Sequence, residues 1–444
     1  MKILNRKIHW FNPGHEDAIR TNSPHYTPPA SVCRMMTDLA LLPLWYSNEN
    51  DYVIINEASE SSRFLLALPA NIRPAAIPVL PSEFNSAFPV EATPWGLSPQ
   101  SIQFFETHFA QNENIIIPPW KEKYKELTGR QTALACLSKI QNFLPGFFDS
   151  LILPQFCSTI DEIRTCLDTY PPPYMLKTPF SCSGRGLYRL PTCDLDMQTT
   201  RWIHGALRKQ GIISIEQNLD KVCDFAMEFE SDGNGHIHFK GLAVFNTQSK
   251  GTYSGNLLGS QSFIEKYLSD FIPISYLLTI QETLTTILSE VLGYDYQGYL
   301  GVDMMVYRRE NTFAIHPMVE INLRNTMGLV ALQISNRLIH TSSHGQLIIS
   351  FNKDKNTTYN AHLQMQKDYP LQLSASKIQS GYLSLCPVTP ETQYLAYMMV
   401  VQSEVVHKKS LLNVDFQDPL HHRIDISEGS LHKGARNHAG AGIL

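Results

Sequence analysis

The stretch YLGVDMMVYRRENTFAIHPMVEIN, residues 299–322, carries the pattern that decides the fold. Two runs of apolar residues flank a short polar segment, which is typical of two antiparallel strands joined by a turn. If Asn311-Thr312 is that turn, counting outward places Asp303 opposite Glu320, with their side chains about 5 Å apart. Pro317 lies inside the second run, and a proline there often accompanies a bulge, which would shift this register. We predict a hairpin in which two carboxylates face each other.

These two carboxylates interrupt otherwise apolar strands, and like charges at that distance repel each other on a half-buried sheet. Asn322 lies two residues beyond Glu320 and therefore shares its face. One or two carboxylates and an amide oxygen, completed by phosphate oxygens, suit Mg²⁺ or Mn²⁺. The alternative is that Asp303 and Glu320 form ion pairs with local arginines such as Arg308 or Arg324. We favour a divalent metal site formed by Asp303, Glu320 and Asn322.

A second informative stretch is PPPYMLKTPFSCSGRGLYRL, residues 171–190. Its apolar run, Tyr174-Met175-Leu176, predicts a buried strand that ends at Lys177. The glycine loop after this strand consists of small, hydroxyl and basic residues, among them Ser181, Ser183, Gly184, Arg185 and Gly186. Such a loop can bring backbone N–H groups close to an anion, and its arginine adds fixed positive charge. The loop fits a phosphate, although an ordinary surface hairpin with a solvated arginine explains it too.

The order of these features along the chain is informative in itself. A helix with Arg130 is followed by a strand, a helix, the strand that ends at Lys177, the glycine loop, a strand with Glu216, and finally MVEINLRNTMG, residues 318–328. This order resembles the ATP-grasp superfamily of ligases, such as biotin carboxylase and the D-alanine–D-alanine ligases. The resemblance covers residues 126–330. Its most specific piece is MVEINLRNTMG, because the Glu-x-Asn-x-Arg pattern carries metal ligands and an active-site arginine in that superfamily.

The resemblance implies roles for the metal site and the glycine loop. Asp303, Glu320 and Asn322 would hold Mg²⁺ (or Mn²⁺) against the phosphates of ATP. Arg324 would act in catalysis by stabilising charge on the transferring phosphoryl group or its acceptor. The glycine loop would be a flexible lid over the triphosphate, and its Arg185 would help to neutralise the phosphate charge.

The resemblance also implies which residues bind the rest of the nucleotide. Lys177 would contact the α- or β-phosphate, with Arg130 helping from the preceding helix. A linker after the next strand would read the adenine edge through its backbone, and an acid shortly beyond it would take the ribose hydroxyls. These residues are Glu216, Gln217 and Leu219 for adenine, and Asp220 or Asp224 for ribose.

The strand and helix signals predict a mixed α/β (α+β) fold with a Rossmann-like N-terminal domain, and the resemblance implies that this is a pre-ATP-grasp domain that precedes the ATP-grasp fold. The N-terminal segments KIHWFN, YVIINE and AAIPVL read as strands separated by helices, which indicates a largely parallel sheet. We predict four parts. They are an N-terminal domain at 1–125, a lid subdomain at 126–225, a C-terminal subdomain with the metal site at 226–345, and an extension of short strands with a mobile tail at 346–444.

Composition restricts the partners and the location. The 444 residues include 36 Lys and Arg against 41 Asp and Glu, so no basic field favours a nucleic-acid partner. The 8 cysteines include no CxxC pair, which argues against a structural zinc site or a disulfide framework. No apolar run is long enough to cross a membrane, and the N-terminus lacks the apolar core of a signal peptide. We expect a protein of the reducing cytoplasm with no membrane partner.

The resemblance implies an ATP- and Mg-dependent ligase that activates a carboxylate as an acyl phosphate for attack by an amine or another nucleophile. The acceptor would be a small-molecule or peptide carboxylate. Since ATP-grasp proteins are often dimers, a homodimer is one expectation. Two alternatives stay open, which are a small-molecule kinase on the ATP-grasp fold and a non-catalytic nucleotide-binding module.

A last stretch, HWFNPGHEDAI at residues 9–19, places polar residues directly after the first predicted strand. Open α/β sheets bind ligands at this end of their strands, so Asn12, His15, Glu16 and Asp17 could touch the acceptor. The same residues also fit a plain helix start, because acids favour the positive N-terminal end of a helix. The sequence leaves both interpretations open.

Overall fold

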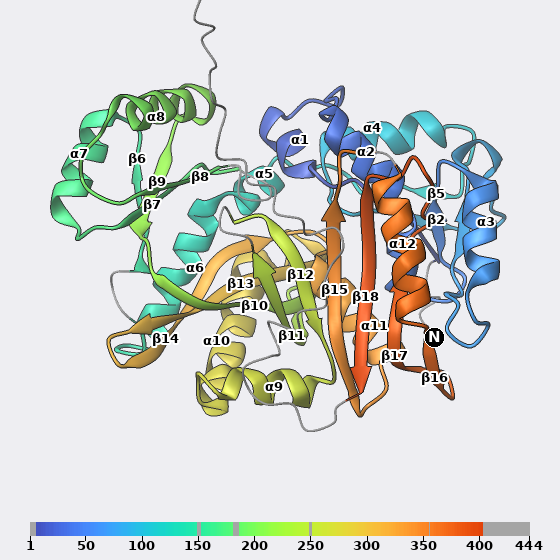
Figure 1. The fold of residues 1–444 in the computed structure, drawn as a ribbon. Helices are drawn as coiled ribbons and strands as arrows, with labels where there is room; N and C mark the ends of the chain where they lie inside the picture. Colours follow the sequence, from blue (N-terminus) through green and yellow to red (C-terminus); the bar gives the residue numbers. More distant parts are fainter. Residues whose placement is uncertain (1–5, 149–151, 181–185, 248–250, 355, 403–444) are drawn as a thin grey trace, which may run out of the picture. The chain divides into compact units, whose positions relative to one another are not determined.

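The computed structural model describes residues 6–148, 152–180, 186–247, 251–354 and 356–402. The chain divides into two compact units, Met1–Glu404 and Val405–Leu444, and the described residues all belong to the first. Within them three β-sheets, of five, four and nine strands, organise the fold (Figure 1). The tail that the sequence predicts to be mobile lies outside the described residues.

The N-terminal part is a five-stranded parallel sheet in the order β3-β2-β1-β4-β5. Its strands are β1 (Arg6–Trp10), β2 (Tyr52–Ile54), β3 (Ile77–Val79), β4 (Val90–Pro94) and β5 (Ile115–Ile116). Its helices are α1 (His15–Thr21), α2 (Ala30–Asp38), α3 (Ala58–Ala67) and α4 (Pro99–His108), with 3-10 turns η1 (Leu42–Trp45) and η2 (Pro81–Glu83). The predicted parallel α/β arrangement is confirmed. Because the strand order reverses between β1 and β4, a crevice is expected beyond the carboxyl ends of these two strands.

The second sheet has four antiparallel strands in the order β6-β9-β7-β8. They are β6 (Gln155–Cys157), β7 (Tyr174–Lys177), β8 (Leu187–Leu190) and β9 (Ile213–Gln217). Helices α7 (Ile160–Thr169) and α8 (Met197–Gln210) share a core with one face of this sheet, through alternate residues such as Leu176 and Ile215. By the same alternation Lys177 and Glu216 occupy the other face. Helix α7 begins after the N-cap residue Thr159, which forms a capping box with Glu162.

The third sheet has nine strands in the order β14-β13-β10-β11-β12-β15-β18-β17-β16. They are β10 (Asp220–Asp232), β11 (Ile237–Thr247), β12 (Tyr253–Leu258), β13 (Gln297–Arg309), β14 (Thr312–Asn322), β15 (Ser343–Phe351), β16 (Gln372–Ser374), β17 (Lys377–Ser384) and β18 (Tyr394–Gln402). The C-terminal strands therefore continue the same sheet as the predicted metal hairpin. The predicted domain boundaries themselves stay a prediction.

The two faces of the nine-stranded sheet have different chemistry. On β10 the alternate residues Phe225, Met227 and Phe229 are buried in one core, which α6 (Arg130–Phe143), α9 (Gln261–Ser269) and α10 (Ile274–Leu292) share. Asp224 and Glu228 alternate with them and point to the opposite face. Helix α11 (Met327–Leu338) packs with Leu258 in a separate core. The remaining helices are α5 (Lys123–Thr128) and α12 (Thr357–Asp368).

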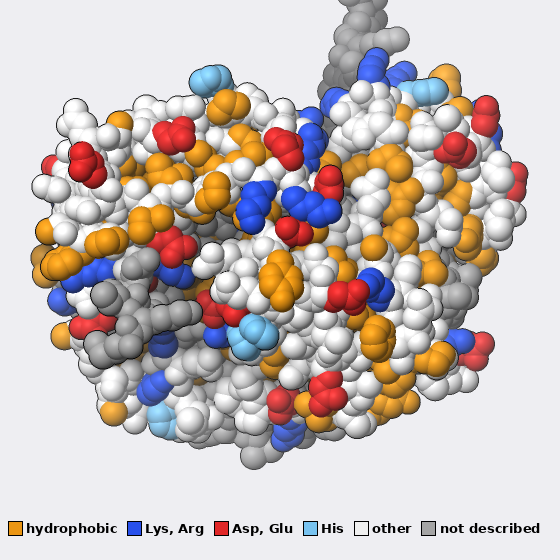
Figure 2. Space-filling view, turned by 180° about the vertical axis from the view of Figure 1, so that it is seen from behind, with side chains coloured by type: hydrophobic (Ala, Val, Ile, Leu, Met, Phe, Trp, Pro, Cys, Tyr) orange, Lys and Arg blue, Asp and Glu red, His pale blue; other side chains and the backbone are white. Residues whose placement is uncertain are grey.

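Among the described helices no single one is long and apolar enough to cross a membrane. Helices α9 and α10 reach that length only together, and they meet at a bend of 115°. In the view from behind, acidic and basic side chains of the described residues lie interspersed among polar and apolar ones (Figure 2).

Candidate functional site

The β13–β14 hairpin places Asp303 directly opposite Glu320, as the sequence predicts. The turn is Glu310-Asn311, one residue earlier than predicted, which by itself would shift the register by two residues. A bulge after Asp303, opposite the segment that contains Pro317, shifts it back by the same amount. The predicted pairing is therefore confirmed, although the structure reaches it through a different turn and a bulge.

The environment of Asp303 favours a bound cation. Burial, followed by repulsion from Glu320, raises the pKa of Asp303 to about 7, although Arg324 and a hydrogen bond from Asn322 act in the opposite direction. A second negative charge at this place is therefore costly unless a positive charge lies between the two carboxylates. Asn322 pairs with Gly301 at the end of the same ladder, on the face of Asp303 and Glu320.

The donor set fits a hard divalent cation that is shared with a phosphate. Among the described residues no group of three His, Cys, Asp or Glu side chains could hold a metal ion. Two carboxylates and one amide oxygen leave coordination positions for phosphate oxygens or water, which is the way Mg²⁺ is commonly held in nucleotide sites. The chemistry of the residues therefore suits Mg²⁺ or Mn²⁺, and the predicted role of Asp303, Glu320 and Asn322 stays a prediction.

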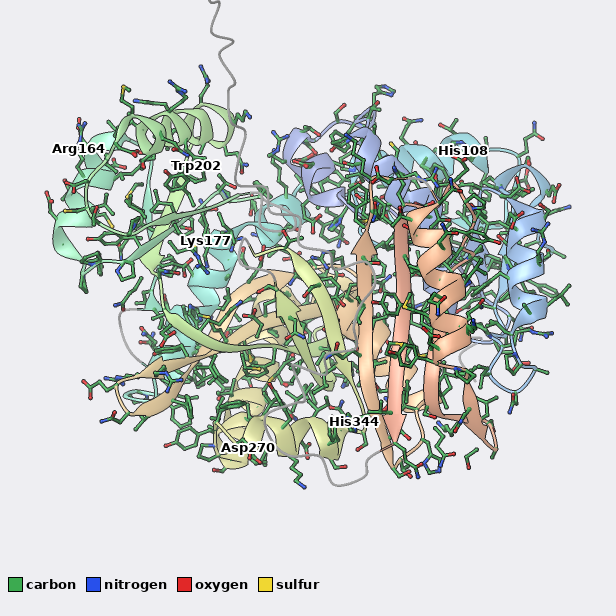
Figure 3. The ribbon with its side chains drawn as sticks, viewed as in Figure 1. His108, Arg164, Lys177, Trp202, Asp270 and His344 are labelled. Carbon is green, nitrogen blue, oxygen red and sulfur yellow. The ribbon has the colours of Figure 1, made fainter. Side chains whose placement is uncertain are left out.

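The two cations predicted to bind phosphate lie next to this hairpin. Arg130, at the start of α6, has its NH2 3.4 Å from Glu320 Oε1 and donates from Nε to the backbone oxygen of Thr178 at 3.0 Å. Lys177, the residue before Thr178, forms an ion pair with Glu216. Figure 3 shows Lys177, the last residue of β7, on the sheet beneath the helices that carry Arg164 and Trp202. Both cations are buried, and each has a carboxylate partner within the protein.

Glu216 is a buried carboxylate that stays ionised. Burial would raise the pKa of Glu216, but attraction by Lys177, together with that of His316, overcomes it and lowers the pKa to about 2. His316 Nε2 lies 3.9 Å from the second carboxylate oxygen, which is too far for a hydrogen bond, and burial lowers the pKa of His316. The resemblance implied a backbone role for Glu216. Here its side chain also fixes Lys177, and His316 is a neighbour that the sequence did not reveal.

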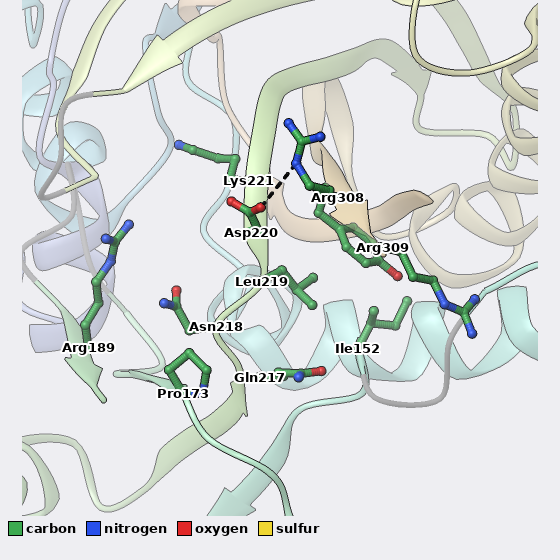
Figure 4. A pocket seen from close by; sticks show the side chains of 11 residues that line it. Ile152, Pro173, Arg189, Gln217, Asn218, Leu219, Asp220, Lys221, Arg308 and Arg309 are labelled. Atoms are coloured by element: carbon green, nitrogen blue, oxygen red, sulfur yellow. Dashed lines mark ion pairs between the residues drawn. The ribbon is translucent and has the colours of Figure 1, made fainter. Parts of the chain in front are cut away.

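A cavity of about 690 Å³ lies along the linker between β9 and β10 (Figure 4). It is lined by Gln217, Leu219 and Asp220 of the predicted adenine and ribose residues, together with Arg189, Lys221 and Arg308 among others. Its volume is in the range of small-molecule sites in proteins. The acids predicted for ribose have basic partners. Asp220 is 3.4 Å from Arg308 Nε, and Asp224 pairs with Lys221.

Arg324 connects the metal hairpin with the N-terminal sheet. Its Nε donates to Glu16 Oε1 at 2.8 Å, and its NH2 donates to Asn322 Oδ1 at 2.8 Å. The NPGHED turn therefore meets the end of β14, as the interpretation in terms of a site requires. The contact that the structure shows is with Arg324, whereas contact with an acceptor stays a prediction.

Glu228 on β10, which the sequence patterns did not single out, is only 1% exposed. Burial, together with repulsion from Asp303, raises its pKa to about 8, although its hydrogen bond with Thr326 acts in the opposite direction. Thr326 Oγ1 donates to Glu228 Oε2 at 2.8 Å and accepts from the N–H of Leu329, so it connects the carboxyl group to the start of α11. The sequence did carry a signal for this residue, because Glu228 is an acid that alternates with the apolar residues of β10.

Most of the predicted glycine loop falls outside the part of the chain that the structure describes. Ser181, Ser183, Gly184 and Arg185 lie outside the described residues. Gly186 is described, and its backbone oxygen accepts a hydrogen bond from the N–H of Thr178 at 2.9 Å. This bond closes the base of the loop one residue beyond Lys177, and the predicted phosphate contacts of the loop stay a prediction.

No protein-family model and no curated protein matches the sequence. Solved structures do match. A biotin carboxylase from Campylobacter jejuni, in complex with β-γ-ATP, aligns with a TM-score of 0.51 at 11% identity and covers 91% of this chain and 89% of that chain. An N5-carboxyaminoimidazole synthase from Aspergillus clavatus, in complex with ADP and 5-aminoimidazole ribonucleotide, has a TM-score of 0.49 at 10% identity. This alignment covers 94% of this chain and 98% of that chain. The protein has the ATP-grasp fold, as the sequence predicts.

Proposed function

We propose that the protein is an ATP- and Mg-dependent ligase, which activates a carboxylate as an acyl phosphate for attack by an amine or another nucleophile. The observation that carries this proposal is the arrangement of two buried cations, Lys177 and Arg130, beside the facing carboxylates Asp303 and Glu320 in an ATP-grasp fold. Positive groups on one side and metal-binding oxygens on the other suit a magnesium-bound triphosphate.

The described residues divide the work of binding. Asp303, Glu320 and Asn322 would hold Mg²⁺, which when bound neutralises phosphate charge and orients the nucleotide. Arg130 and Lys177 would then bind phosphate oxygens in addition to their present partners. The linker at Gln217 and Leu219 would accommodate the adenine in the cavity beside it. The adenosine end and the phosphate end of ATP would thus lie along the junction of the four-stranded and nine-stranded sheets.

The reaction would proceed in two steps, both of which depend on charge stabilisation. A carboxylate oxygen of the acceptor attacks the γ-phosphorus, the bond to the β-phosphate oxygen breaks, and ADP leaves. The nucleophile then attacks the carbonyl carbon of the acyl phosphate and inorganic phosphate leaves. Arg324, fixed beside Asn322, would stabilise the negative charge that develops on the transferring group.

Trapping with hydroxylamine tests this proposal. The full chain is incubated with ATP, Mg²⁺, hydroxylamine and a panel of small-molecule and peptide carboxylates. We expect a hydroxamate with at least one acid, and ADP released in equal amount. An acceptor that gives a stable phosphorylated product and never a hydroxamate would identify a kinase. Nucleotide binding without any turnover would identify a non-catalytic module.

The remaining proposals concern the acceptor, the oligomeric state and the location of the protein. The acceptor would be a small-molecule or peptide carboxylate. We also propose a homodimer and a cytoplasmic location. Light scattering of the purified chain tests the first, and fractionation of cells that produce it tests the second.

A further inference from the structure

We propose that Glu16, in the first turn of α1, is a positioning residue that orients Arg324 for the reaction. This inference rests on the proposed function, in which Arg324 stabilises the transferring group. It assigns to the N-terminal part of the protein a direct role in setting the geometry of the reactive centre. The sequence allowed Glu16 either to touch the acceptor or to start a helix, and the structure places it in the first turn of α1 with its side chain in contact with Arg324.

The contacts around Arg324 fix its guanidinium from two sides. Nε donates to Glu16 Oε1 at 2.8 Å, and NH2 donates to Asn322 Oδ1 at 2.8 Å. Nε and NH2 lie on the same edge of the planar guanidinium, so two acceptors on this edge determine both its position and its tilt. One acceptor belongs to the proposed metal site, and the other belongs to the N-terminal sheet. Without Glu16 the guanidinium would lose this contact with the N-terminal part of the protein.

The charge of Glu16 strengthens this contact. Glu16 is only 8% exposed, and burial would raise its pKa, yet His15 and Arg324 lower the pKa to about 2. Burial lowers the pKa of His15 to about 4, so His15 is neutral near pH 7 and Arg324 is the charge that keeps Glu16 ionised. A charged hydrogen bond in a buried place is stronger and more directional than a neutral one.

The start of α1, which carries Glu16, is held against the segment that follows β4. Asn12 donates to the backbone oxygen of Gly96 at 2.8 Å and accepts from its N–H at 3.2 Å. The ring of His15 packs so closely on Gly96 that an added Cβ there would lie 2.2 Å from it. Gly14, directly before α1, adopts φ 91°, a left-handed conformation that favours glycine. Glu16 thus lies on a helix start that is held in place by its neighbours, which is what a positioning residue requires.

Glu16→Ala, Glu16→Gln and a matched control test the proposal. The control is Glu60→Gln, which makes the same change in the first turn of another N-terminal helix, α3, where Glu60 pairs with Arg63 at 3.0 Å. Release of ADP at saturating ATP gives kcat, and its dependence on ATP gives KM. Because a ligase and a kinase both release ADP, this assay stands even if the hydroxylamine test fails.

We expect kcat to fall about a hundredfold in Glu16→Ala and about tenfold in Glu16→Gln, which retains an oxygen acceptor for Nε. KM for ATP should stay within threefold in both, and Glu60→Gln should match the parent. The N–H signal of Arg324 Nε, assigned in arginine-labelled protein with Arg324→Lys, should shift in the Glu16 variants alone.

Two results would overturn the inference. One is a Glu16→Gln variant that folds and behaves like Glu60→Gln in both kcat and the Arg324 signal. The other is a rise in KM for ATP as large as the fall in kcat, which would mean that Glu16 serves nucleotide binding or general stability.

Discussion

Asp303 on β13 lies directly opposite Glu320 on β14, and this pairing places two carboxylates side by side in a largely buried part of the sheet. Arg130 reaches Glu320 from α6 at 3.4 Å, so the pair already lies next to a cation. The arrangement is unfavourable without further positive charge, and a magnesium-bound nucleotide would supply it. Substitutions that each remove a single charge can therefore test the site and the residues that support it.

Replacing either carboxylate should abolish turnover without unfolding the protein. We expect Asp303→Asn and Glu320→Gln to lower Mg²⁺-dependent ADP release at least about a hundredfold, because each removes a preorganised charge from the site. Glu230→Gln is a matched control, since Glu230 lies on the neighbouring strand β10 and pairs with Lys240 at 3.0 Å. Turnover within a few-fold of the parent in either site variant would rule out the metal assignment.

The raised pKa of Asp303 predicts a pH dependence of metal binding. With a pKa of about 7, this carboxyl group is mostly protonated at pH 6 and mostly ionised at pH 8. Since a proton competes with the metal, Mn²⁺ measured by electron paramagnetic resonance without nucleotide should bind about tenfold tighter at pH 8 than at pH 6. Equal affinity at the two pH values would contradict the assignment of Asp303 as a ligand.

The same group should lower the stability of the metal-free protein as pH rises. The pKa of Asp303 is raised in the folded state, so the folded state binds the proton more tightly than the unfolded chain. Its stabilising contribution is present at low pH and is lost as pH rises through about 7. Burial of His15 has the opposite effect on stability. It lowers the pKa of His15 from 6.5 to about 4, so its contribution to stability increases as pH rises between these two values. The difference in melting temperature between the parent and Asp303→Asn, measured in EDTA, should therefore change with pH.

Lys177 should matter for stability as well as for nucleotide binding. Lys177→Ala leaves the buried carboxylate of Glu216 without its cation, which typically costs about 3–5 kcal/mol. We expect urea unfolding to show this loss and the double variant Lys177→Met/Glu216→Gln to recover most of it. In the stable double variant, calorimetry should show weaker binding of ATP and nearly unchanged binding of adenosine. An equal loss for both ligands would assign Lys177 to structure alone.

The buried carboxyl of Glu228 requires a glycine at the start of α11. A Cβ at Gly328 would lie 2.0 Å from Glu228 Oε1 and 3.0 Å from Ala243 Cβ. Gly328→Ala should therefore destabilise the protein by about 1–3 kcal/mol in urea unfolding. Gly205→Ala is the control, because Gly205 lies inside α8 with open space around it, and alanine there should stabilise by about 1 kcal/mol. A neutral Gly328→Ala would show that the carboxyl group moves freely.

The sequence predicted the parts of the site that depend on local pattern. The alternation in the hairpin and the strand that ends at Lys177 each depend on neighbouring residues, and both are confirmed. The turn was misplaced because Glu310 adopts φ 52°, a left-handed conformation that glutamate rarely takes. The bulge near Pro317 then restored the predicted pairing.

The long-range contacts could not be predicted from a single sequence. The pairs Glu16–Arg324 and Arg130–Glu320 join residues far apart in the chain, and which partners meet depends on how the three sheets pack. The strand β5 has only two residues and leaves almost no periodic signal. An acid within an apolar strand, such as Glu228, does leave a signal in the sequence. In this case the signal marks a buried carboxyl group that is not one of the predicted metal ligands.

Transfer of an oxygen isotope tests the central claim most directly. An acceptor that gives a hydroxamate is prepared with ¹⁸O in its carboxylate and is turned over with ATP, Mg²⁺ and the nucleophile. If the carboxylate is activated as an acyl phosphate, one ¹⁸O atom per turnover moves into inorganic phosphate, which mass spectrometry detects. Release of ADP with unlabelled inorganic phosphate would contradict the account, because the carboxylate oxygen would then never have bonded to the γ-phosphorus.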